Sequence, residues 1–335
     1  MLGEDVKRLR EQKGMLQAAF AQWLNERLGR RYDGPKISRW EGNREKIPEA
    51  VLRFLLREQA GPDAQHGPAY VVACTNNKGG VGKTTTSVNL GSVLAAQGNR
   101  VLVIDADPQA HATANLGLDT PDYEQEIKKS LPHVLRDQVT LRDVIVPVRP
   151  SGLEVVPSCL GLSFVENDLI SDSSGPLAMR EKIAEIKDDY DFIIIDCPPN
   201  LGQMTTNALL ACHGVVIPTQ TEYLASLGME KLLASIAKIK RRFVSEFQIL
   251  GILPTMHDVR LHQHQVVLEH LHTTFGQNLR IFPPIPRATV HGEAALAGRA
   301  AFEVEPEAPG AANLRVVVDA LVNEREKRLE VLNVA

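Results

Sequence analysis

The chain has 335 residues, of which 44% are hydrophobic and 23% are charged, and its formal net charge is −4. This composition is typical of a globular protein and excludes disordered, collagen-like and low-complexity chains, while the length allows two domains. The four cysteines show no CxxC spacing, no apolar run approaches the roughly 18 residues that span a bilayer, and no secretory leader is apparent. We therefore expect a cytoplasmic protein.

Positive charge gathers at the beginning of the chain. Residues 1–60 contain 13 Lys and Arg against 9 Asp and Glu, a net charge of +4, whereas the remaining residues contain 24 against 32. A small basic module on an acidic body indicates an anionic partner for that module. A normally solvated surface explains the same imbalance equally well.

Residues 1–58 place their apolar side chains at helical spacing and predict four or five short helices without a strand. The segments "DVKRLREQKGMLQAAFAQWL" and "KISRWEGNREKIP" resemble the lambda-repressor-like helix-turn-helix domain. The resemblance places Gln17 at the start of the second helix. It places Lys36, Ser38 and Arg39 on the recognition helix, where they would read DNA bases. A small helical domain that binds protein is the alternative.

A linker is predicted at residues 59–68, where "QAGPDAQHGP" is rich in Gly, Pro and Ala. Beyond it, short apolar runs alternate with helical segments. Runs that are apolar on both faces predict parallel strands with helices on both sides. Residues 69–335 are therefore expected to form an α/β domain with a mostly parallel sheet, preceded by the small all-α domain. The runs are "AYVVACT", "RVLVID", "LEVVPS", "DFIIID", "GVVIPT" and "FQILGILPT", with "LRIFPPIP" as a weaker seventh.

A phosphate-binding loop follows the first predicted strand. The segment "NNKGGVGKTT" at 76–85 stands between that strand and a helix expected to run to about Gln97. Glycines let the backbone wrap closely around an anion, so that N–H groups point at phosphate oxygens. In such a loop Lys83 would neutralise the β- and γ-phosphates, the Thr84 hydroxyl would bind Mg²⁺ and Thr85 would touch the α-phosphate.

One position of this loop departs from the motif G-x-x-x-x-G-K-[ST], because Asn77 replaces the first glycine and Lys78 follows it. "KGGVGKTT" resembles the deviant Walker A motif of the ParA/MinD superfamily of ATPases. The resemblance implies an ATP- and Mg²⁺-dependent ATPase that dimerises on ATP, in which Lys78 reaches the nucleotide of the partner subunit and acts with Lys83 in catalysis. It implies nucleotide contacts by Lys78, Gly79, Gly80, Val81, Gly82, Lys83, Thr84 and Thr85. Further segments resemble the ParA branch: "VLVIDADPQ", "DFIIIDCPPNLG", "TTNALLA", "TEYLASLGMEKLL", "LPTMHDVR" and "IPRATVHGEAALAGRAAFEVEP".

Two apolar runs end in carboxylates. "VLVIDADPQ" contributes Asp105 and Asp107, and "DFIIID" contributes Asp196, at the strand ends where ligands bind in open α/β sheets. The resemblance assigns Asp107 to the attacking water and places Asp105 and Asp196 near Mg²⁺ with Thr84. Phosphoryl transfer requires mainly positioning and charge neutralisation. The alternative for the first two aspartates is that they cap the segment after the strand.

The adenine site is expected, by the same resemblance, where two late segments end. These are Thr255–Met256 and Pro286–Arg287, of which Met256 and Pro286 are the expected contacts. Core packing or a turn explains each of them equally well.

A second basic segment, "AKIKRRF", ends a long predicted helix. It contains Lys238, Lys240, Arg241 and Arg242, and Arg260 is expected close by. The resemblance implies that this surface binds nonspecific DNA in the ATP-bound dimer. A basic helix end is also what the helix dipole favours without any ligand.

The leading interpretation is a partition ATPase that associates with the nucleoid, is stimulated by a ParB-type centromere-binding protein and represses its own operon. Alternatives are a MinD-like positioning ATPase for a non-DNA cargo, a nucleotide-switched transcriptional repressor, and a metabolic enzyme such as an amide ligase or iron–sulfur reductase. The segment "NLRVVVDALVNEREKRLEVLNVA" has mixed charge and no aromatic residue, so we expect no membrane binding. The sequence lacks paired cysteines that could hold an iron–sulfur cluster, and it has the added DNA-binding module. Both observations argue against the metabolic enzymes.

Overall fold

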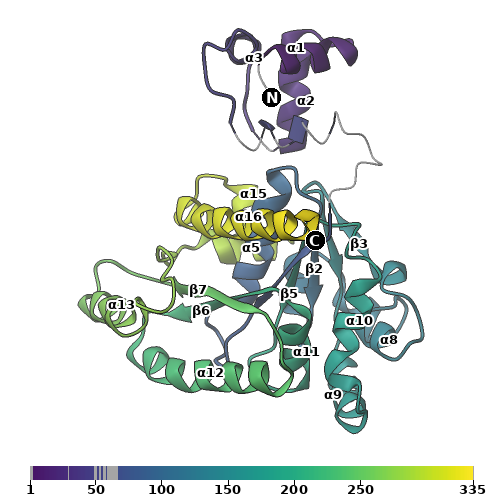
Figure 1. Cartoon of the computed structure of the whole chain (residues 1–335), viewed down its shortest axis with the longest axis vertical. Helices are drawn as coiled ribbons and strands as arrows, with labels where there is room; N and C mark the ends of the chain where they lie inside the picture. The colour runs from purple at the N-terminus through teal and green to yellow at the C-terminus, as the bar shows by residue number, and fades with distance from the viewer. Residues whose placement is uncertain are drawn as a thin grey trace.

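The computed structural model describes residues 3–28, 30–48, 51–52, 54–55, 58 and 67–334. Its main body is a sheet covered by helices on both faces, and the amino-terminal helices lie on the side of α5 and α16 (Figure 1). Residues 59–66 of the predicted linker lie outside the described residues.

The amino-terminal helices pack around a small core of their own. They are α1 (Gly3–Gln12), α2 (Gln17–Leu28) and α3 (Gly34–Glu41), and residues 51–52 and 54–55 are also helical. Phe20, Ile37 and Trp40 are fully buried in this core. No strand occurs among the described residues of this part, in agreement with the helical spacing of its apolar residues.

The sheet has the strand order β3-β4-β2-β5-β1-β6-β7, and all neighbouring strands are parallel except β3 and β4. The strands are β1 (Tyr70–Cys74), β2 (Val101–Asp105), β3 (Val146–Val148), β4 (Leu153–Val156), β5 (Phe192–Asp196), β6 (Gly214–Gln220) and β7 (Gln248–Thr255). The six stronger apolar runs each form a strand of this sheet, which confirms the mostly parallel α/β fold.

The weaker seventh run was wrongly expected to form a strand. In "LRIFPPIP" only Ile281 and Pro286 make isolated bridges, to Ile252 and His257. Its prolines carry no backbone N–H to donate to a neighbouring strand. The seventh strand is β3, which was not predicted: it is three residues long, has Pro147 at its centre, and pairs antiparallel with β4 at the edge of the sheet.

Two hydrophobic layers cover the faces of the sheet, because successive strand residues point to opposite sides. Val71 and Ala73 belong to one layer, with α8 to α13, whereas Tyr70 and Val72 belong to the other, with α5, α6 and α14 to α16.

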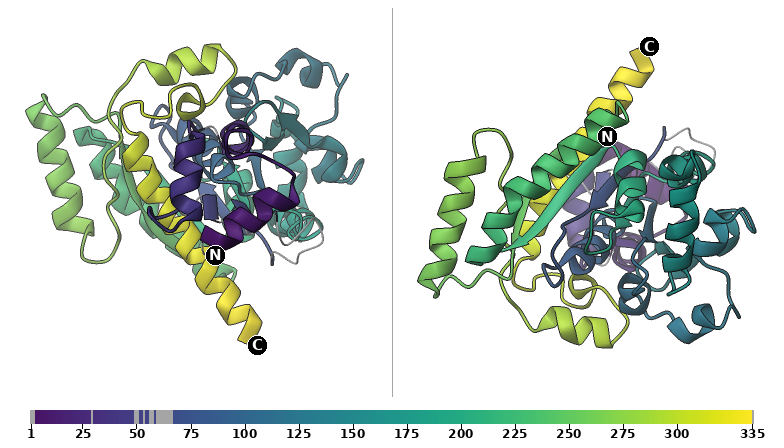
Figure 2. Two further views of the ribbon diagram at one scale, coloured as in Figure 1. Left: turned by 90° about the horizontal axis from the view of Figure 1, so that it is seen from above. Right: turned by 90° about the horizontal axis from the view of Figure 1, so that it is seen from below.

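The last turns of α16 project beyond the body (Figure 2). None of the helices in the described ranges is both long and apolar enough to cross a membrane. The helices of the body are α5 (Lys83–Ala96), α6 (His111–Asn115), α7 (Thr120–Glu124), α8 (Leu131–Leu135), α9 (Leu162–Ser171), α10 (Ala178–Ala184), α11 (Gln203–Ala211), α12 (Tyr223–Arg242), α13 (His262–Phe275), α14 (Val290–Leu296), α15 (Ala301–Val304) and α16 (Ala311–Val334).

Candidate functional site

The loop between β1 and α5 has the backbone of an anion-binding turn. Gly80 and Gly82 adopt left-handed conformations, with φ of 72° and 84°, which glycine accepts without steric cost. A Cβ atom added at Gly79 or Gly80 would have no neighbour within 4 Å, so the loop is open on that side. Lys83 Nζ donates a 2.9 Å hydrogen bond to the carbonyl oxygen of Lys78 and closes the loop.

Side chains from two further strands hold the outside of this loop. Gln220 Nε2 donates to the carbonyl of Gly80 at 3.0 Å, and Thr255 Oγ1 donates to the carbonyl of Val81 at 2.8 Å. Because the peptide unit is planar and trans, the N–H groups that follow these carbonyls point the opposite way. The loop therefore presents N–H groups to its open interior, the arrangement that binds phosphate oxygens.

The predicted carboxylates meet beside this loop. Asp105 and Asp196 end neighbouring strands and are paired in register. Asp196 Oδ1 accepts a 2.8 Å hydrogen bond from Ser87 Oγ, whereas Oδ2 is buried and makes no hydrogen bond. Burial and then the charge of Asp105 raise the pKa of Asp196, against hydrogen bonding from Thr84 and Ser87.

These groups fit a magnesium ion. A buried carboxylate oxygen without a partner carries a free-energy cost, and a hard divalent cation with oxygen ligands would remove that cost. The hydroxyl of Thr84 lies next to the same carboxylate and provides a second oxygen. Lys83 is also buried here, and burial lowers its pKa although Asp196 and Asp107 favour its charged form.

Asp105 is held by hydrogen bonds from the loop that follows β2. Its Oδ2 accepts hydrogen bonds from the backbone N–H and the hydroxyl of Thr113, at 2.8 and 2.7 Å, and its Oδ1 accepts from the N–H of Asp107 at 3.2 Å. Both oxygens are thus engaged by the loop after β2, and the expectation that Asp105 lies near Mg²⁺ with Thr84 and Asp196 stays a prediction. Asp107 is 5% exposed, and its Oδ1 accepts from the N–H of Gln109 at 3.0 Å.

A cavity of about 210 Å³ lies next to the start of α5 and is lined by both predicted adenine contacts, Met256 and Pro286. Met256 has a left-handed backbone, with φ of 51°, and its Sδ lies 3.0 Å from Gln220 Nε2. The phosphate loop and this cavity share Gly82 and Thr85, so a nucleotide bound at the loop can reach it.

Sequence reasoning missed several side chains of this cavity, among them Asn89, His291 and Phe302. Asn89 donates from Nδ2 to the carbonyl of Thr85 at 2.8 Å and accepts the N–H of Phe302 on Oδ1 at 3.1 Å, which joins α5 to α15. His291 packs edge-on against Phe302. The available signal was a polar Asn within the otherwise small and apolar stretch of α5; nothing local marks the other two.

The predicted DNA contacts of the amino-terminal helices are engaged within the chain. Lys36 and Arg39 both form ion pairs with Glu45, and Ser38 is exposed beside them. Gln17, at the first residue of α2, donates to Glu41 Oε2 at 2.8 Å. Asp33 caps α3 by accepting the N–H of Lys36. The two cations are thus aligned on one surface, with a carboxylate between them.

The basic end of α12 lies at the opposite edge of the sheet from the phosphate loop. None of its four cations, Lys238, Lys240, Arg241 and Arg242, pairs with a carboxylate among the described residues. Lys240 lies over the ring of Phe247.

We had expected Arg260 close to this helix end, but the structure places it elsewhere. The eight-residue strand β7 separates them by roughly 23 Å, because a strand rises about 3.3 Å per residue. Arg260 instead forms a two-point ion pair with Asp258, at the edge that carries the phosphate loop.

Comparisons with known proteins agree with this geometry. A family description, AAA domain, matches residues 69–249. The sporulation initiation inhibitor protein Soj of Bacillus subtilis is 38% identical over 72% of this chain and 93% of its own length. The chromosome partitioning protein ParA of Caulobacter vibrioides is 33% identical over 78% and 97%. The crystal structure of cobyrinic acid a,c-diamide synthase from Mycobacterium smegmatis with ADP and magnesium has a TM-score of 0.66 at 32% identity, covering 77% and 96% of the two chains. The chain belongs to the ParA/MinD family of ATPases.

Proposed function

We propose that this ATPase is a DNA partition protein. It would bind ATP with Mg²⁺, dimerise on ATP, bind nonspecific DNA on the nucleoid and hydrolyse ATP slowly until a ParB-type centromere-binding protein stimulates it. The observation that carries the nucleotide part is the open phosphate loop beside a buried, unpartnered oxygen of Asp196. Relatives named for chromosome partitioning support the cellular role.

The chain's own residues divide the chemistry between them. Lys83 is held by the loop carbonyl of Lys78 and faces Asp107 and Asp196, so it places one positive charge where phosphates would lie. Mg²⁺, held by Thr84 and Asp196, would supply further charge neutralisation. Asp107 is fixed through Oδ1 by the N–H of Gln109 and would orient the attacking water.

ATP-dependent dimerisation rests on Lys78. Its Cε lies 3.6 Å from the position that a Cβ of Gly228 on α12 would occupy, so the side chain lies along the surface next to the loop. Reaching the partner's nucleotide requires it to leave that surface. Two γ-phosphates buried face to face need such added positive charge.

DNA binding would use two separate parts of the chain. Residues 1–58 would form a helix-turn-helix domain that reads an operator through α3, joined by a linker at 59–68 to the ATPase domain at 69–335. The end of α12 would contact DNA phosphates without reading bases, because its cations, of which Lys240 is half-buried and the others are exposed, have no carboxylate partner among the described residues. Repression of its own operon would follow from the first of these contacts.

Light scattering on the full chain tests the proposal. The Asp107→Ala variant should form a dimer with ATP and Mg²⁺ and a smaller species with ADP. Adding Lys78→Ala should abolish the ATP-specific dimer, whereas Lys129→Ala, which removes an exposed lysine elsewhere, should leave it unchanged. An identical mass with both nucleotides would contradict ATP-dependent dimerisation.

An amide-forming enzyme is the second candidate, because the diamide synthase from Mycobacterium smegmatis shares the fold at 32% identity. ATP turnover would then require a carboxylate acceptor and a nitrogen donor. Under the partition proposal, ATP turnover rises when duplex DNA and a centromere-binding protein encoded by a neighbouring gene are added. No carboxylate acceptor is needed.

A further inference from the structure

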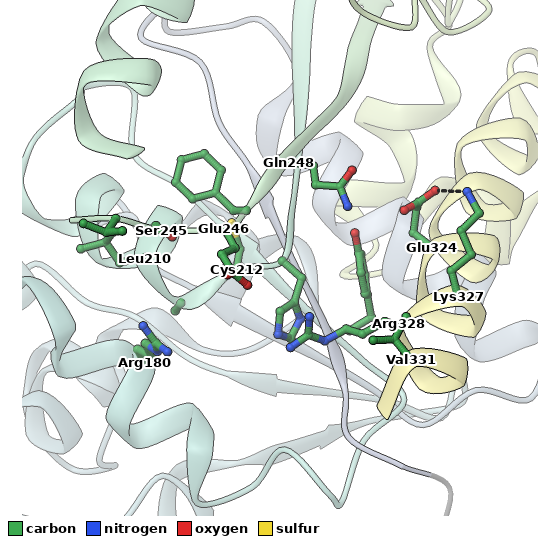
Figure 3. Close-up of a pocket in the computed structure, with 15 residues that line it drawn as sticks. Arg180, Leu210, Cys212, Ser245, Glu246, Gln248, Glu324, Lys327, Arg328 and Val331 are labelled. Atoms are coloured by element: carbon green, nitrogen blue, oxygen red, sulfur yellow. Dashed lines mark hydrogen bonds and ion pairs between the residues drawn. The ribbon is translucent and has the colours of Figure 1, made fainter. Parts of the chain in front are cut away.

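A second cavity, of about 670 Å³, lies at the amino-terminal edge of the sheet, where β1, β6 and β7 begin (Figure 3). The phosphate loop lies at the other end of β1, so the two sites are separate. Side chains from α10 and from the projecting part of α16 form the remaining walls. Its volume is within the range of small-molecule sites, about 300–1,000 Å³.

Tyr70, the first residue of β1, lines this cavity and carries an unsatisfied donor. The side chain lines the cavity and the residue is 3% exposed, yet its hydroxyl is buried without a hydrogen-bond partner. Buried hydroxyl groups are nearly always hydrogen-bonded, because leaving one unpaired costs free energy. A ligand with an acceptor oxygen in the cavity would satisfy it once the side chain turns toward the cavity.

His213 provides a second donor. Its Nδ1 accepts the N–H of Val71 at 3.0 Å, so in the neutral ring the proton is on Nε2. Burial, followed by the charges of Arg328 and Arg180, lowers the pKa of His213 to about 4, so the ring is neutral near pH 7. No hydrogen bond from Nε2 is found among the described residues.

Two arginines face the cavity from different helices. Arg180 is on α10 and Arg328 is on α16, and both line the cavity (Figure 3). Neither pairs with a carboxylate in the described part of the chain. The neighbouring Lys327, by contrast, is paired with Glu324 at 2.7 Å, and Glu246 is exposed at the rim.

The cavity is therefore lined by four donors, two of them permanently charged; of its two carboxylates, Glu324 is paired with Lys327 and Glu246 is exposed. A carboxylate ligand has two oxygens and one charge, whereas a phosphate monoester has three free oxygens and nearly two charges. Guanidinium groups bind phosphate in a two-point geometry. Leu210, Phe247 and Val331 add apolar surface for an organic group. We propose that this cavity binds a small phosphate monoester through Tyr70, His213, Arg180 and Arg328.

Calorimetry on the full chain tests this proposal, with ADP and Mg²⁺ held at saturation so that the phosphate loop is filled. Inorganic phosphate is the first probe; glycerol 3-phosphate and a short DNA duplex follow. Inorganic phosphate should bind one site, Arg328→Gln should weaken it at least tenfold, and Tyr70→Phe should weaken it several-fold. The control variant Lys129→Gln should change affinity less than twofold, because that exposed lysine does not line the cavity.

The outcomes separate the sources of the phosphate. Tighter binding of glycerol 3-phosphate than of inorganic phosphate would support a small organic phosphate as the ligand. Equal affinity for the two would mean that the cavity binds the free anion, and would overturn the proposal of a monoester. Displacement of bound phosphate by DNA would assign the cavity to the nucleic-acid backbone and overturn it too. Absence of phosphate binding in the ADP-saturated protein, or unchanged affinity in folded Arg328→Gln, would overturn the site itself.

Discussion

Ser87 Oγ donates a 2.8 Å hydrogen bond to Oδ1 of Asp196, 109 residues further along the chain. This bond joins the first turns of α5 to the end of β5 and fixes the orientation of the carboxylate. Oδ2 of the same carboxylate is buried and makes no hydrogen bond. The carboxylate proposed to hold Mg²⁺ is thus oriented before any ligand arrives.

The first prediction concerns this bond. Asp196→Asn should lower the Mg²⁺ affinity of the nucleotide complex at least tenfold, because the carboxylate charge is lost. Ser87→Ala should lower it less, because only an orienting hydrogen bond is removed. Magnesium titrations of ATP turnover measure both, and Ser92→Ala, also buried on α5, is the control. Unchanged Mg²⁺ dependence in Asp196→Asn would rule out this site.

The second prediction separates binding from turnover. Lys83→Ala should abolish nucleotide binding, because it removes both the loop closure to Lys78 and the buried positive charge. Asp107→Ala should bind ADP and ATP as the wild type does and lose turnover, since Asp107 would act on the attacking water. Calorimetry and phosphate release measure the two steps. Equal loss of ATP affinity in both variants would contradict these separate roles.

The third prediction separates the two DNA surfaces. Replacing Lys240, Arg241 and Arg242 by glutamine should weaken binding to every duplex and lower the salt dependence by about 0.9 in slope for each lost contact. Lys36→Gln and Arg39→Gln should instead lower the preference for the operator, by about 1–3 kcal/mol each if they reach bases. Fluorescence anisotropy on random and upstream duplexes, with ATP or ADP, measures both effects.

The assignment of these surfaces has a direct control. Binding through α12 should need ATP, because only a dimer doubles the basic surface, whereas operator binding should not. Loss of nonspecific binding on removing residues 1–60, with nonspecific binding intact in the α12 variant, would reverse the assignment.

The fourth prediction concerns the backbone of Met256. Its φ of 51° lies in the left-handed region, which is most costly for side chains branched at Cβ. Met256→Ile should therefore be about 1 kcal/mol less stable than Met256→Leu, although the two side chains have the same volume. Urea unfolding compares them. Equal stability would show that the backbone relaxes there, and both variants should have lower ATP affinity because they lose the thioether contact with Gln220.

The fifth prediction is a pH dependence set by His213. Burial lowers its pKa to about 4, below the ordinary value of about 6.5, so between these values only the unfolded chain takes up the proton. The free energy of unfolding should fall as the pH is lowered through this window, by roughly 3 kcal/mol at most. His213→Gln should flatten the difference between pH 6.5 and 4.5 in phosphate-free buffer. Parallel curves for the two proteins would exclude His213 as the cause.

Local patterns predicted the strands and the phosphate loop well, because each is a continuous segment with its own signature. Side chains that meet only in the folded chain were not predictable. Phe302, whose N–H donates to Asn89, lies 213 residues from that partner, and Thr113, which donates to Asp105, meets it only because the loop between them folds back. The distance between Arg260 and the end of α12 was not predictable for the same reason, since it depends on the direction in which β7 runs.

The order in which the chain is synthesised has a consequence for ATP. The phosphate loop is complete by residue 85, yet the wall of the adjoining cavity includes Met256, Pro286 and Phe302. On the proposal that the base occupies this cavity, a nascent chain that has reached residue 85 carries the loop sequence without the wall for the base. Nucleotide would then stabilise this protein only after most of its sheet has been made, so folding up to that point depends on the chain alone.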